Sequence, residues 1–408
     1  MLLQLFIEHP EARNIAFVAT VALLYGAFSG IFASPAVGLL HLFKLVKMPL
    51  PLSTHSTVRT VLASGAAVSL VSVALVAGSL LSTSKAQAGT GWLELPGLQG
   101  DGPVTVLYPT DAANQTINMG PLQPQLAPRA LPAKNNGRLV VVSHGSGGSP
   151  WVYTEWMDLL VAAGYTVVLP EHAGDNWRDH SKVGPASWAL RPLEVSRAID
   201  VVAADPRFAP TLDFKRVGLW GMSAGGHTAL TLAGGKWSAT GLRDHCQQHI
   251  IDDTATCVTD AIELNGGPFD SMKRGLALAV IRGKLADATV YSHRDPRIQA
   301  IVAGVPFAAD FDLSTLATPL VPLGIVQAEA DVWLKPQFHS GPILAVCQSC
   351  VLIASLPKAG HGALMGPPPP NPPAWLARLI ASHPDFDRAS LLPMHQNTLA
   401  FFQKHLIP

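Results

Sequence analysis

Residues 216–233 read RVGLWGMSAGGHTALTLA, and this stretch decides the expected fold. The first five residues, 216–220, are short and apolar, which is typical of a buried strand, and residues 226–233 are typical of the start of a helix. Between them lies the pentapeptide Gly221-Met222-Ser223-Ala224-Gly225. A G-x-S-x-G sequence between a strand and a helix predicts a nucleophile elbow, a sharp turn at which the serine hydroxyl projects out of the sheet.

The chain after residue 91 alternates between apolar, strand-like runs and helical patterns. This alternation predicts an α/β fold, with a mostly parallel central sheet flanked by helices. Strands are expected at 92–95, 103–108, 138–143, 165–169, 216–220, 298–304, 320–327 and 350–355, the first two as antiparallel edge strands, and helices at 153–163, 187–204 and 392–406. Residues 111–136 are expected to form a loop. Residues 234–296 break the alternation, so they predict an insertion that caps the site.

The composition describes a folded chain of 408 residues, of which 48% are hydrophobic and only 14% are charged. Extensive disorder is therefore not expected. The formal net charge is zero and no basic stripe is present, which argues against nucleic acid as a partner.

Two uncharged stretches, 15–40 and 60–84, precede the α/β region. Each is long enough to cross a hydrocarbon layer of about 30 Å. The second also fits a signal peptide over residues 48–88, with Arg59 in a polar leader and Ala86-Gln87-Ala88 as the cleavage site. Residues 1–47 are then either a misassigned start or an extra membrane segment. Both interpretations predict that the domain 89–408 is exported, as a periplasmic, secreted or membrane-anchored protein. If both stretches span the membrane, the basic loop between them stays in the cytoplasm and the domain lies outside it.

The four cysteines, Cys246, Cys257, Cys347 and Cys350, fit an exported protein, in which an even count predicts two disulfides. Three pairings are open. A redox role for the C-x-x-C motif at Cys347 is disfavoured because no thioredoxin-like unit surrounds it. Zinc would need further ligands at suitable spacing, and none are close. No metal is expected.

A serine hydroxyl becomes a nucleophile when a histidine takes its proton and a carboxylate orients that histidine. In hydrolases with this elbow, the acid and then the base follow the serine along the chain, each after a strand. Asp331 follows the strand expected at 320–327, and His361 follows the one expected at 350–355. They are the predicted partners of Ser223. Asp310 and Asp312, after the preceding strand, are alternative candidates for the acid.

Acyl transfer also needs N–H donors for the negative charge that develops on the carbonyl oxygen. One donor is expected from the backbone of Ala224, directly after the nucleophile, and a second from the loop HGSGG at 144–148, where we favour the Ser146 amide. This loop lacks the Lys-Ser/Thr pair of a P-loop and the spacing of a dinucleotide site. No cofactor is expected.

Four stretches, SHGSGG at 143–148, PEHAGDN at 170–176, GMSAGG at 221–226 and AGH at 359–361, resemble bacterial predicted dienelactone hydrolases, which are similar to platelet-activating-factor acetylhydrolases. The resemblance covers residues 91–408 and implies an α/β-hydrolase fold. It implies a triad of Ser223, Asp331 and His361, an oxyanion hole at Ser146 and Ala224, and a loop-shaping role for residues 171–172. The chain departs from both groups: dienelactone hydrolases proper use a cysteine nucleophile, and the acetylhydrolases carry the acid after the earlier strand.

These features predict an exported serine hydrolase that cleaves carboxylic esters through an acyl-enzyme intermediate. Lactone or thioester hydrolysis on the same scaffold is an alternative, as is a non-catalytic exported binding module. Five aromatic residues are expected on loops near the rim of the site: Trp151, Tyr153, Trp177, Trp188 and Trp333. They favour a small-molecule substrate with an apolar acyl or aromatic group, or else they serve as packing anchors.

Overall fold

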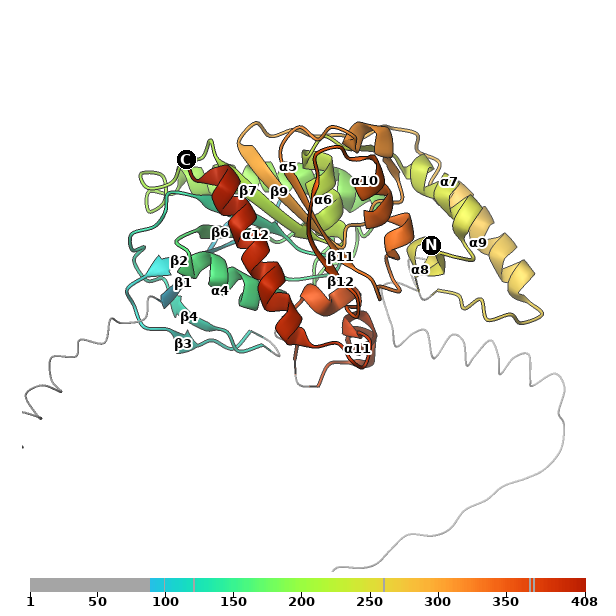
Figure 1. Ribbon diagram of the computed structural model, residues 1–408, viewed down its shortest axis with the longest axis horizontal. Coiled ribbons are helices and arrows are strands. Elements are labelled where there is room, and N and C mark those ends of the chain that lie inside the picture. The colour runs from blue at the N-terminus through green and yellow to red at the C-terminus, as the bar shows by residue number, and fades with distance from the viewer. Residues whose placement is uncertain (1–88, 99, 120–121, 260, 367, 370) are drawn as a thin grey trace, which may run out of the picture. The chain divides into compact units, whose positions relative to one another are not determined.

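The computed structural model describes residues 89–98, 100–119, 122–259, 261–366, 368–369 and 371–408. Its centre is a ten-stranded mixed sheet in the order β12-β11-β9-β7-β5-β6-β2-β1-β4-β3 (Figure 1). The strands are β1 (Gly89–Leu95), β2 (Val104–Thr110), β3 (Gln115–Thr116), β4 (Gln125–Pro128), β5 (Leu139–Ser143), β6 (Thr166–Pro170), β7 (Val217–Met222), β9 (Ile298–Gly304), β11 (Leu323–Ala328) and β12 (Val351–Leu356). The predicted α/β fold with a mostly parallel sheet is confirmed.

The helices are α4 (Thr154–Ala162), α5 (Pro185–Ala204), α6 (Ala224–Leu232), α7 (Ala239–His249), α8 (Thr254–Val258), α9 (Asp270–Lys284), α10 (Ser340–Val346), α11 (Ala374–Ile380) and α12 (Leu391–Leu406). Within the part of the chain just given, no helix has the length and apolar character needed to cross a membrane. The predicted signal peptide and membrane segments lie outside the described residues.

Six neighbouring strands, β6, β5, β7, β9, β11 and β12, run parallel. Every residue of β5, β6 and β7 is buried. Parallel strands covered on both faces by helices are apolar at nearly every position. This is why their sequences predict strands so clearly.

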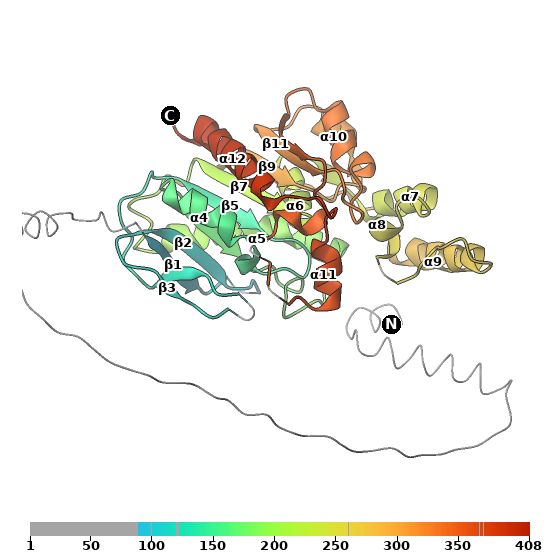
Figure 2. The same cartoon turned by 60° about the horizontal axis from the view of Figure 1, so that its bottom comes forward.

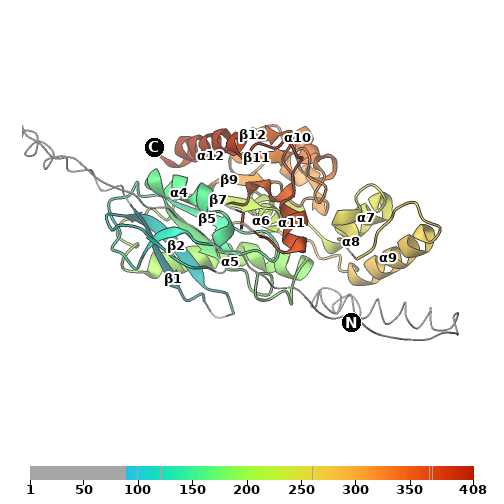
Figure 3. The same cartoon turned by 90° about the horizontal axis from the view of Figure 1, so that it is seen from below.

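Helices cover both faces of the parallel strands, and alternate residues of each strand point to opposite sides. On one face, Leu139 and Val141 of β5 belong to the same core as residues of α5 and α6. On the other, Val140 and Val142 share a core with residues of α4 and α12. Figure 3 shows α4 and α12 on one side of the strands and α5 on the other. The carboxyl ends of the parallel strands therefore form one edge between two helical layers.

The predicted position of the first two strands and the predicted loop at 111–136 are wrong. β1 and β2 are antiparallel, as expected, but β2 also pairs with β6 and β1 also pairs with β4, so neither lies at an edge. The supposed loop contains β3 and β4, which form the real edge. β4 contacts β1 through two residue pairs only. A strand this short has too few positions to show a periodic pattern.

Residues 234–296, called the insertion below, contain α7, α8 and α9 and contribute no strand to the ten-stranded sheet. Its short strand β8 (Lys236–Trp237) pairs instead with β10 (Phe311–Asp312). In Figure 2 the insertion helices lie together at one end of the described region, beyond α6 and α11.

Both predicted disulfides are present, and the structure decides their pairing. Cys246 of α7 is bonded to Cys257 of α8, and Cys347 is bonded to Cys350 between α10 and β12. Both bridges are local, spanning 11 and 3 residues of sequence.

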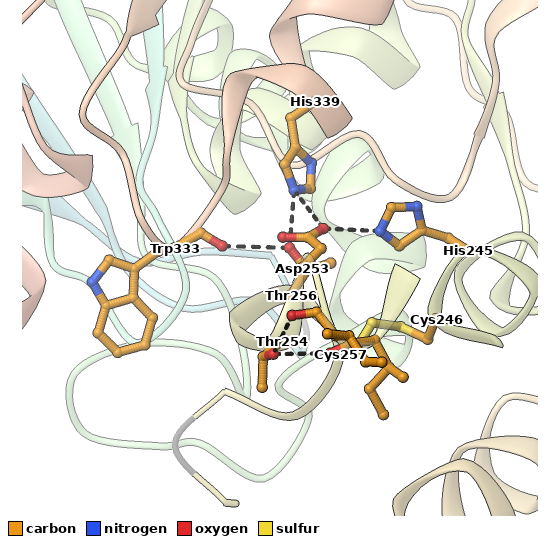
Figure 4. The surroundings of a disulfide bond; sticks show 10 residues. His245, Cys246, Asp253, Thr254, Thr256, Cys257, Trp333 and His339 are labelled. Atoms are coloured by element: carbon orange, nitrogen blue, oxygen red, sulfur yellow. Dashed lines mark hydrogen bonds and ion pairs between the residues drawn. A yellow bond between two sulfur atoms is a disulfide. The ribbon is translucent and has the colours of Figure 1, made fainter. Parts of the chain in front are cut away.

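A buried carboxylate beside the first disulfide joins the insertion to the rest of the fold (Figure 4). Asp253 receives a hydrogen bond from His245 at 2.8 Å and lies 3.6 Å from His339, the residue that precedes α10. Burial raises the pKa of Asp253, but the hydrogen bonds from these two histidines outweigh that effect and hold the pKa well below its usual range. The other ring nitrogen of His339 accepts from the Ala308 amide at 3.0 Å.

Candidate active site

The expected elbow is formed where β7 ends and α6 begins. Ser223 has φ 58° and ψ −116°, a strained conformation for a residue other than glycine. The flanking glycines are required by close backbone approach. A Cβ atom on Gly221 would lie 2.0 Å from the Gly225 oxygen, and one on Gly225 would lie 1.9 Å from the Ser143 oxygen. Strand, turn and neighbouring loop can pack this tightly only without those side chains.

Three side chains that are far apart in sequence form one hydrogen-bonded relay at the carboxyl edge of the sheet. His361 Nε2 lies 3.0 Å from Ser223 Oγ, and His361 Nδ1 lies 2.7 Å from Asp331 Oδ2. Asp331 comes three residues after β11, and His361 begins a short 3₁₀ helix (His361–Leu364) that follows β12. The structure thus brings together the three residues that the sequence predicted as nucleophile, acid and base.

The position of Asp331 is itself held in place. Its Oδ1 accepts hydrogen bonds from the backbone amides of Trp333 and Leu334, each at 2.8 Å. Its Oδ2 is then directed at His361, and Asp331 and His361 are both buried. A proton on His361 Nδ1 that is donated to this carboxylate leaves Nε2 free to accept from the Ser223 hydroxyl.

The two alternative acids make other contacts. Asp310 is wholly buried and pairs with His227 Nε2 at 3.0 Å. Asp312 is exposed and caps a 3₁₀ helix by accepting from the Ser314 amide at 3.1 Å. Among the residues described, the carboxylate that hydrogen-bonds to His361 is that of Asp331.

The backbone N–H groups of Ser146 and Ala224 are the two donors that the sequence predicted for an oxyanion hole. Ala224 is the first residue of α6, so its N–H is one of the donors left unpaired at a helix N-terminus. The loop 144–148 runs beside the nucleophile, since a Cβ atom on Gly145 would lie 3.4 Å from Ser223 Cβ. Within the described part of the chain, the Ser146 N–H has no hydrogen-bond acceptor. It is therefore available to a ligand.

A buried ion pair that sequence reasoning missed holds this loop. Asp175 Oδ1 accepts from Ser146 Oγ at 2.7 Å and from the Gly147 amide at 2.8 Å. Asp175 Oδ2 pairs with Arg191 Nη2 at 2.9 Å, and Arg191 Nη1 donates to the His144 oxygen at 2.5 Å. Both charged side chains are wholly buried. Asp175 lies in the stretch 170–176 that carries the resemblance, but Arg191 had no signal because it lies inside a helix, α5.

Two buried histidines extend the network in defined tautomers. His144 Nδ1 donates to the Gly145 oxygen at 2.7 Å, and its Nε2 accepts from the His172 amide at 3.2 Å. His172 bonds to the Glu194 carboxylate through Nδ1 at 2.5 Å and to Ser143 Oγ through Nε2 at 2.8 Å. His172 therefore ties the segment after β6 to the end of β5 and to α5.

Tyr153 also contacts the loop 144–148 and helps to hold it in place. Its hydroxyl oxygen accepts from the Gly145 amide at 3.1 Å, and its ring packs edge-on against Trp220 at 5.0 Å. Burial raises the pKa of Tyr153 to about 12, so the phenol stays protonated. Together, the tyrosine, the ion pair and the histidines leave the loop 144–148 little freedom to move.

The five aromatic residues predicted at the rim differ in burial. Trp151 is half-buried and packs edge-on against Trp92 at 5.7 Å. Tyr153 and Trp188 are buried packing residues, and Trp188 lies against His227 at 4.9 Å. Trp177 is exposed and donates to Glu171 at 3.1 Å. Trp333 is half-buried, and its backbone amide donates to Asp331 at 2.8 Å.

Replacing Asp175 with asparagine is expected to destabilise the fold strongly. Burial raises the pKa of Asp175, but Arg191 and the hydrogen bonds from the loop outweigh it and lower the pKa to about 2. The carboxylate is therefore charged, and its loss leaves Arg191 buried without a counter-ion. Such a loss costs about 3–5 kcal/mol. Urea unfolding of the variant measures this change.

Asp200→Asn is the matched control, because Asp200 forms an exposed pair with Arg297. We expect it to cost about 1 kcal/mol or less. Equal losses in the two variants would contradict the assignment of a structural ion pair beneath the loop.

Acid is expected to destabilise the protein through the buried histidines. Burial, followed by the charge of Arg191, lowers the pKa of His172 well below its ordinary value, and burial followed by His172 lowers that of His144. The unfolded chain therefore binds protons below pH 6.5, while the folded chain does not. The contribution of each neutral ring to the free energy of unfolding is therefore fully present above that pH and decreases as the pH falls below it. At pH 5.5 the loss is about 1.4 kcal/mol per ring.

Denaturant unfolding at pH 7.5 and pH 5.5 measures this loss. In His144→Asn one titrating ring is absent, so the difference between the two pH values should shrink by about 1.4 kcal/mol. An unchanged difference would mean that His144 does not contribute.

The described residues contain no group of three or more histidine, cysteine or acidic side chains that could hold a metal ion. No protein-family model matches the chain, and a comparison with curated proteins finds no match.

Proposed function

We propose that this protein is a serine hydrolase of the α/β-hydrolase type that cleaves carboxylic esters. The observation that carries the proposal is the relay Ser223–His361–Asp331, with bonds of 3.0 and 2.7 Å, at the carboxyl edge of the sheet. Strain at the nucleophile supports it, since unfavourable backbone conformations persist where function requires them. The finer likeness to bacterial predicted dienelactone hydrolases rests on the four sequence stretches alone.

The relay is suited to two-step acyl transfer. His361 Nε2 takes the proton of Ser223 Oγ as the oxygen attacks the ester carbonyl, and a tetrahedral intermediate forms. His361 then gives that proton to the leaving alkoxide as the C–O bond breaks, which leaves an acyl-enzyme. Water then attacks the acyl group as His361 takes its proton. His361 returns that proton to Ser223 Oγ as the acyl–oxygen bond breaks, which releases the acid product and regenerates the serine. Asp331 stabilises the protonated ring in both halves of the reaction.

Two backbone donors are proposed to receive the oxyanion. In this mechanism the N–H groups of Ser146 and Ala224 stabilise the negative charge that develops on the carbonyl oxygen in the transition state. The buried network of Asp175, Arg191 and His144 serves catalysis indirectly, because it holds the loop that carries the Ser146 amide.

We also propose that residues 89–408 work outside the cytoplasm. The support is the pair of disulfides, which take up all four cysteines of the chain. Disulfides persist in oxidising compartments and are rare in the cytosol. Fractionation of expressing cells with an antibody to the domain tests this, and recovery of the domain from the cytosol in reduced form would contradict it.

The decisive test of the hydrolase assignment uses the full-length chain and a fluorophosphonate probe. An activated serine forms a covalent adduct, and mass spectrometry should locate it on the peptide that contains Ser223. Turnover is then measured with short- and long-chain esters, a lactone and a thioester, which separates the esterase from the lactonase and thioesterase alternatives. A folded protein that neither labels nor turns over any of these substrates would support a non-catalytic binding module instead.

A further inference from the structure

Helix α9 has an apolar side that faces solvent. Phe269, directly before the helix, is 63% exposed, and Met272 and Leu276 are each 67% exposed. Residues three and four positions apart lie on the same side of a helix, so these three form one continuous face. The other side of α9 is the packed one. There Ile281 is buried and Leu278 is partly buried against the core.

Basic side chains border this exposed face. At 100° per residue, Lys273 and Lys284 lie on one side of the apolar face and Arg282 on the other, and Arg282 and Lys284 are exposed. The single acidic residue of the helix, Asp270, lies at its start and pairs with Lys273 at 3.4 Å. An apolar helix face bordered by lysine and arginine is the pattern of helices that lie in the surface of a lipid bilayer.

The place of α9 in the fold leaves this side accessible. In Figures 1, 2 and 3, α9 lies beside α7 at one end of the described region. The disulfide between Cys246 and Cys257 fastens α7 to α8 within the same insertion. Helix α9 therefore belongs to an insertion whose other two helices are joined by a disulfide bond.

We propose that this side of α9 is a membrane-binding surface and that its partner is an anionic lipid bilayer. Anionic headgroups complement the basic border, and acyl chains accept Phe269, Met272 and Leu276. A second copy of the chain fits less well, because a two-fold contact through the same face would bring the basic borders of both helices together. The uncharged stretches at 15–40 and 60–84, expected to meet a membrane, agree with this partner. None of the residues on which this proposal rests belongs to the proposed catalytic relay, so the proposal is independent of the proposed function.

A site-specific probe tests the proposal in the full-length chain. Because the four cysteines are all in disulfides, Leu276→Cys carries a single free thiol for an environment-sensitive fluorophore. Leu131→Cys, at a residue 83% exposed in the loop after β4, is the control. Both labelled proteins are reconstituted in phosphatidylcholine vesicles, with and without phosphatidylglycerol, that contain quencher-bearing lipid. Circular dichroism verifies that each variant is folded.

The expected result is quenching at residue 276 but not at residue 131, and stronger quenching when phosphatidylglycerol is present. The double variant Arg282→Gln, Lys284→Gln should lower the ratio of membrane-bound to unbound α9 about thirtyfold in the anionic vesicles. Equal quenching at the two positions would overturn the proposal. A blue shift at residue 276 in detergent that grows with protein concentration would also overturn it, and would assign the face to a second copy of the chain.

Discussion

Ser223→Ala is expected to abolish ester hydrolysis and fluorophosphonate labelling while the fold remains intact. The side chain supplies the attacking oxygen, and neither His361 nor the oxyanion donors can replace it. Removal of the nucleophile from a serine triad lowers kcat by a factor on the order of 10⁴ or more. Steady-state kinetics with the best ester of the panel measures the loss, and thermal unfolding verifies that the variant keeps its stability.

Ser314→Ala is the matched control for this experiment. Ser314 is exposed and its hydroxyl bonds to Asp312 at 2.7 Å, away from the relay. We expect wild-type turnover and labelling from this variant. If Ser223→Ala also retained wild-type turnover, the nucleophile would have to be another residue and the proposed mechanism would be wrong.

Asp331→Asn is expected to lower kcat by about 10⁴-fold with little change in KM. The Asp331 carboxylate accepts the proton on His361 Nδ1 at 2.7 Å, whereas an amide can turn its NH₂ group toward that nitrogen. The ring proton then moves to Nε2, which can no longer accept from Ser223 Oγ. Kinetics across pH 6 to 9 measures the loss and shows that it is not recovered at high pH.

Two further substitutions make this result specific to one acid. Asp310→Asn changes a carboxylate that pairs with His227, and Asp312→Asn changes an exposed carboxylate that caps a 3₁₀ helix. We expect kcat within a few-fold of wild type for both, since neither removes the partner of His361. A large loss of kcat in Asp310→Asn, with Asp331→Asn near wild type, would reverse the assignment and place the acid after β9.

Much of the fold could be predicted because its central strands are buried on both faces. The apolar runs expected at 138–143, 165–169 and 298–304 match β5, β6 and β9 to within one residue at each end. The helix expected at 392–406 matches α12 equally well. Long, strongly patterned segments carry their own signal, since burial demands apolar side chains at regular intervals.

The short strands could not be predicted in the same way. β3 and β8 have two residues each, and they are strands only because a partner lies alongside. No periodicity exists in two residues, so the neighbouring chain decides the conformation. The same holds for β4, which turns a supposed loop into the edge of the sheet.

The candidate site likewise has features that the sequence predicted and features that only chain packing set. The sequence by itself predicted the elbow, because the pentapeptide 221–225 lies between an apolar, strand-like run and a helical one. It also predicted Ser223, Asp331 and His361, in this chain order, as nucleophile, acid and base. Only the tertiary structure decided that Asp331 and not Asp310 faces His361, that Cys246 pairs with Cys257, and that Asp175 and Arg191 hold the loop 144–148. These are relations between residues on separate elements, and a hydrogen bond or ion pair depends on distances of a few ångströms that only chain packing sets.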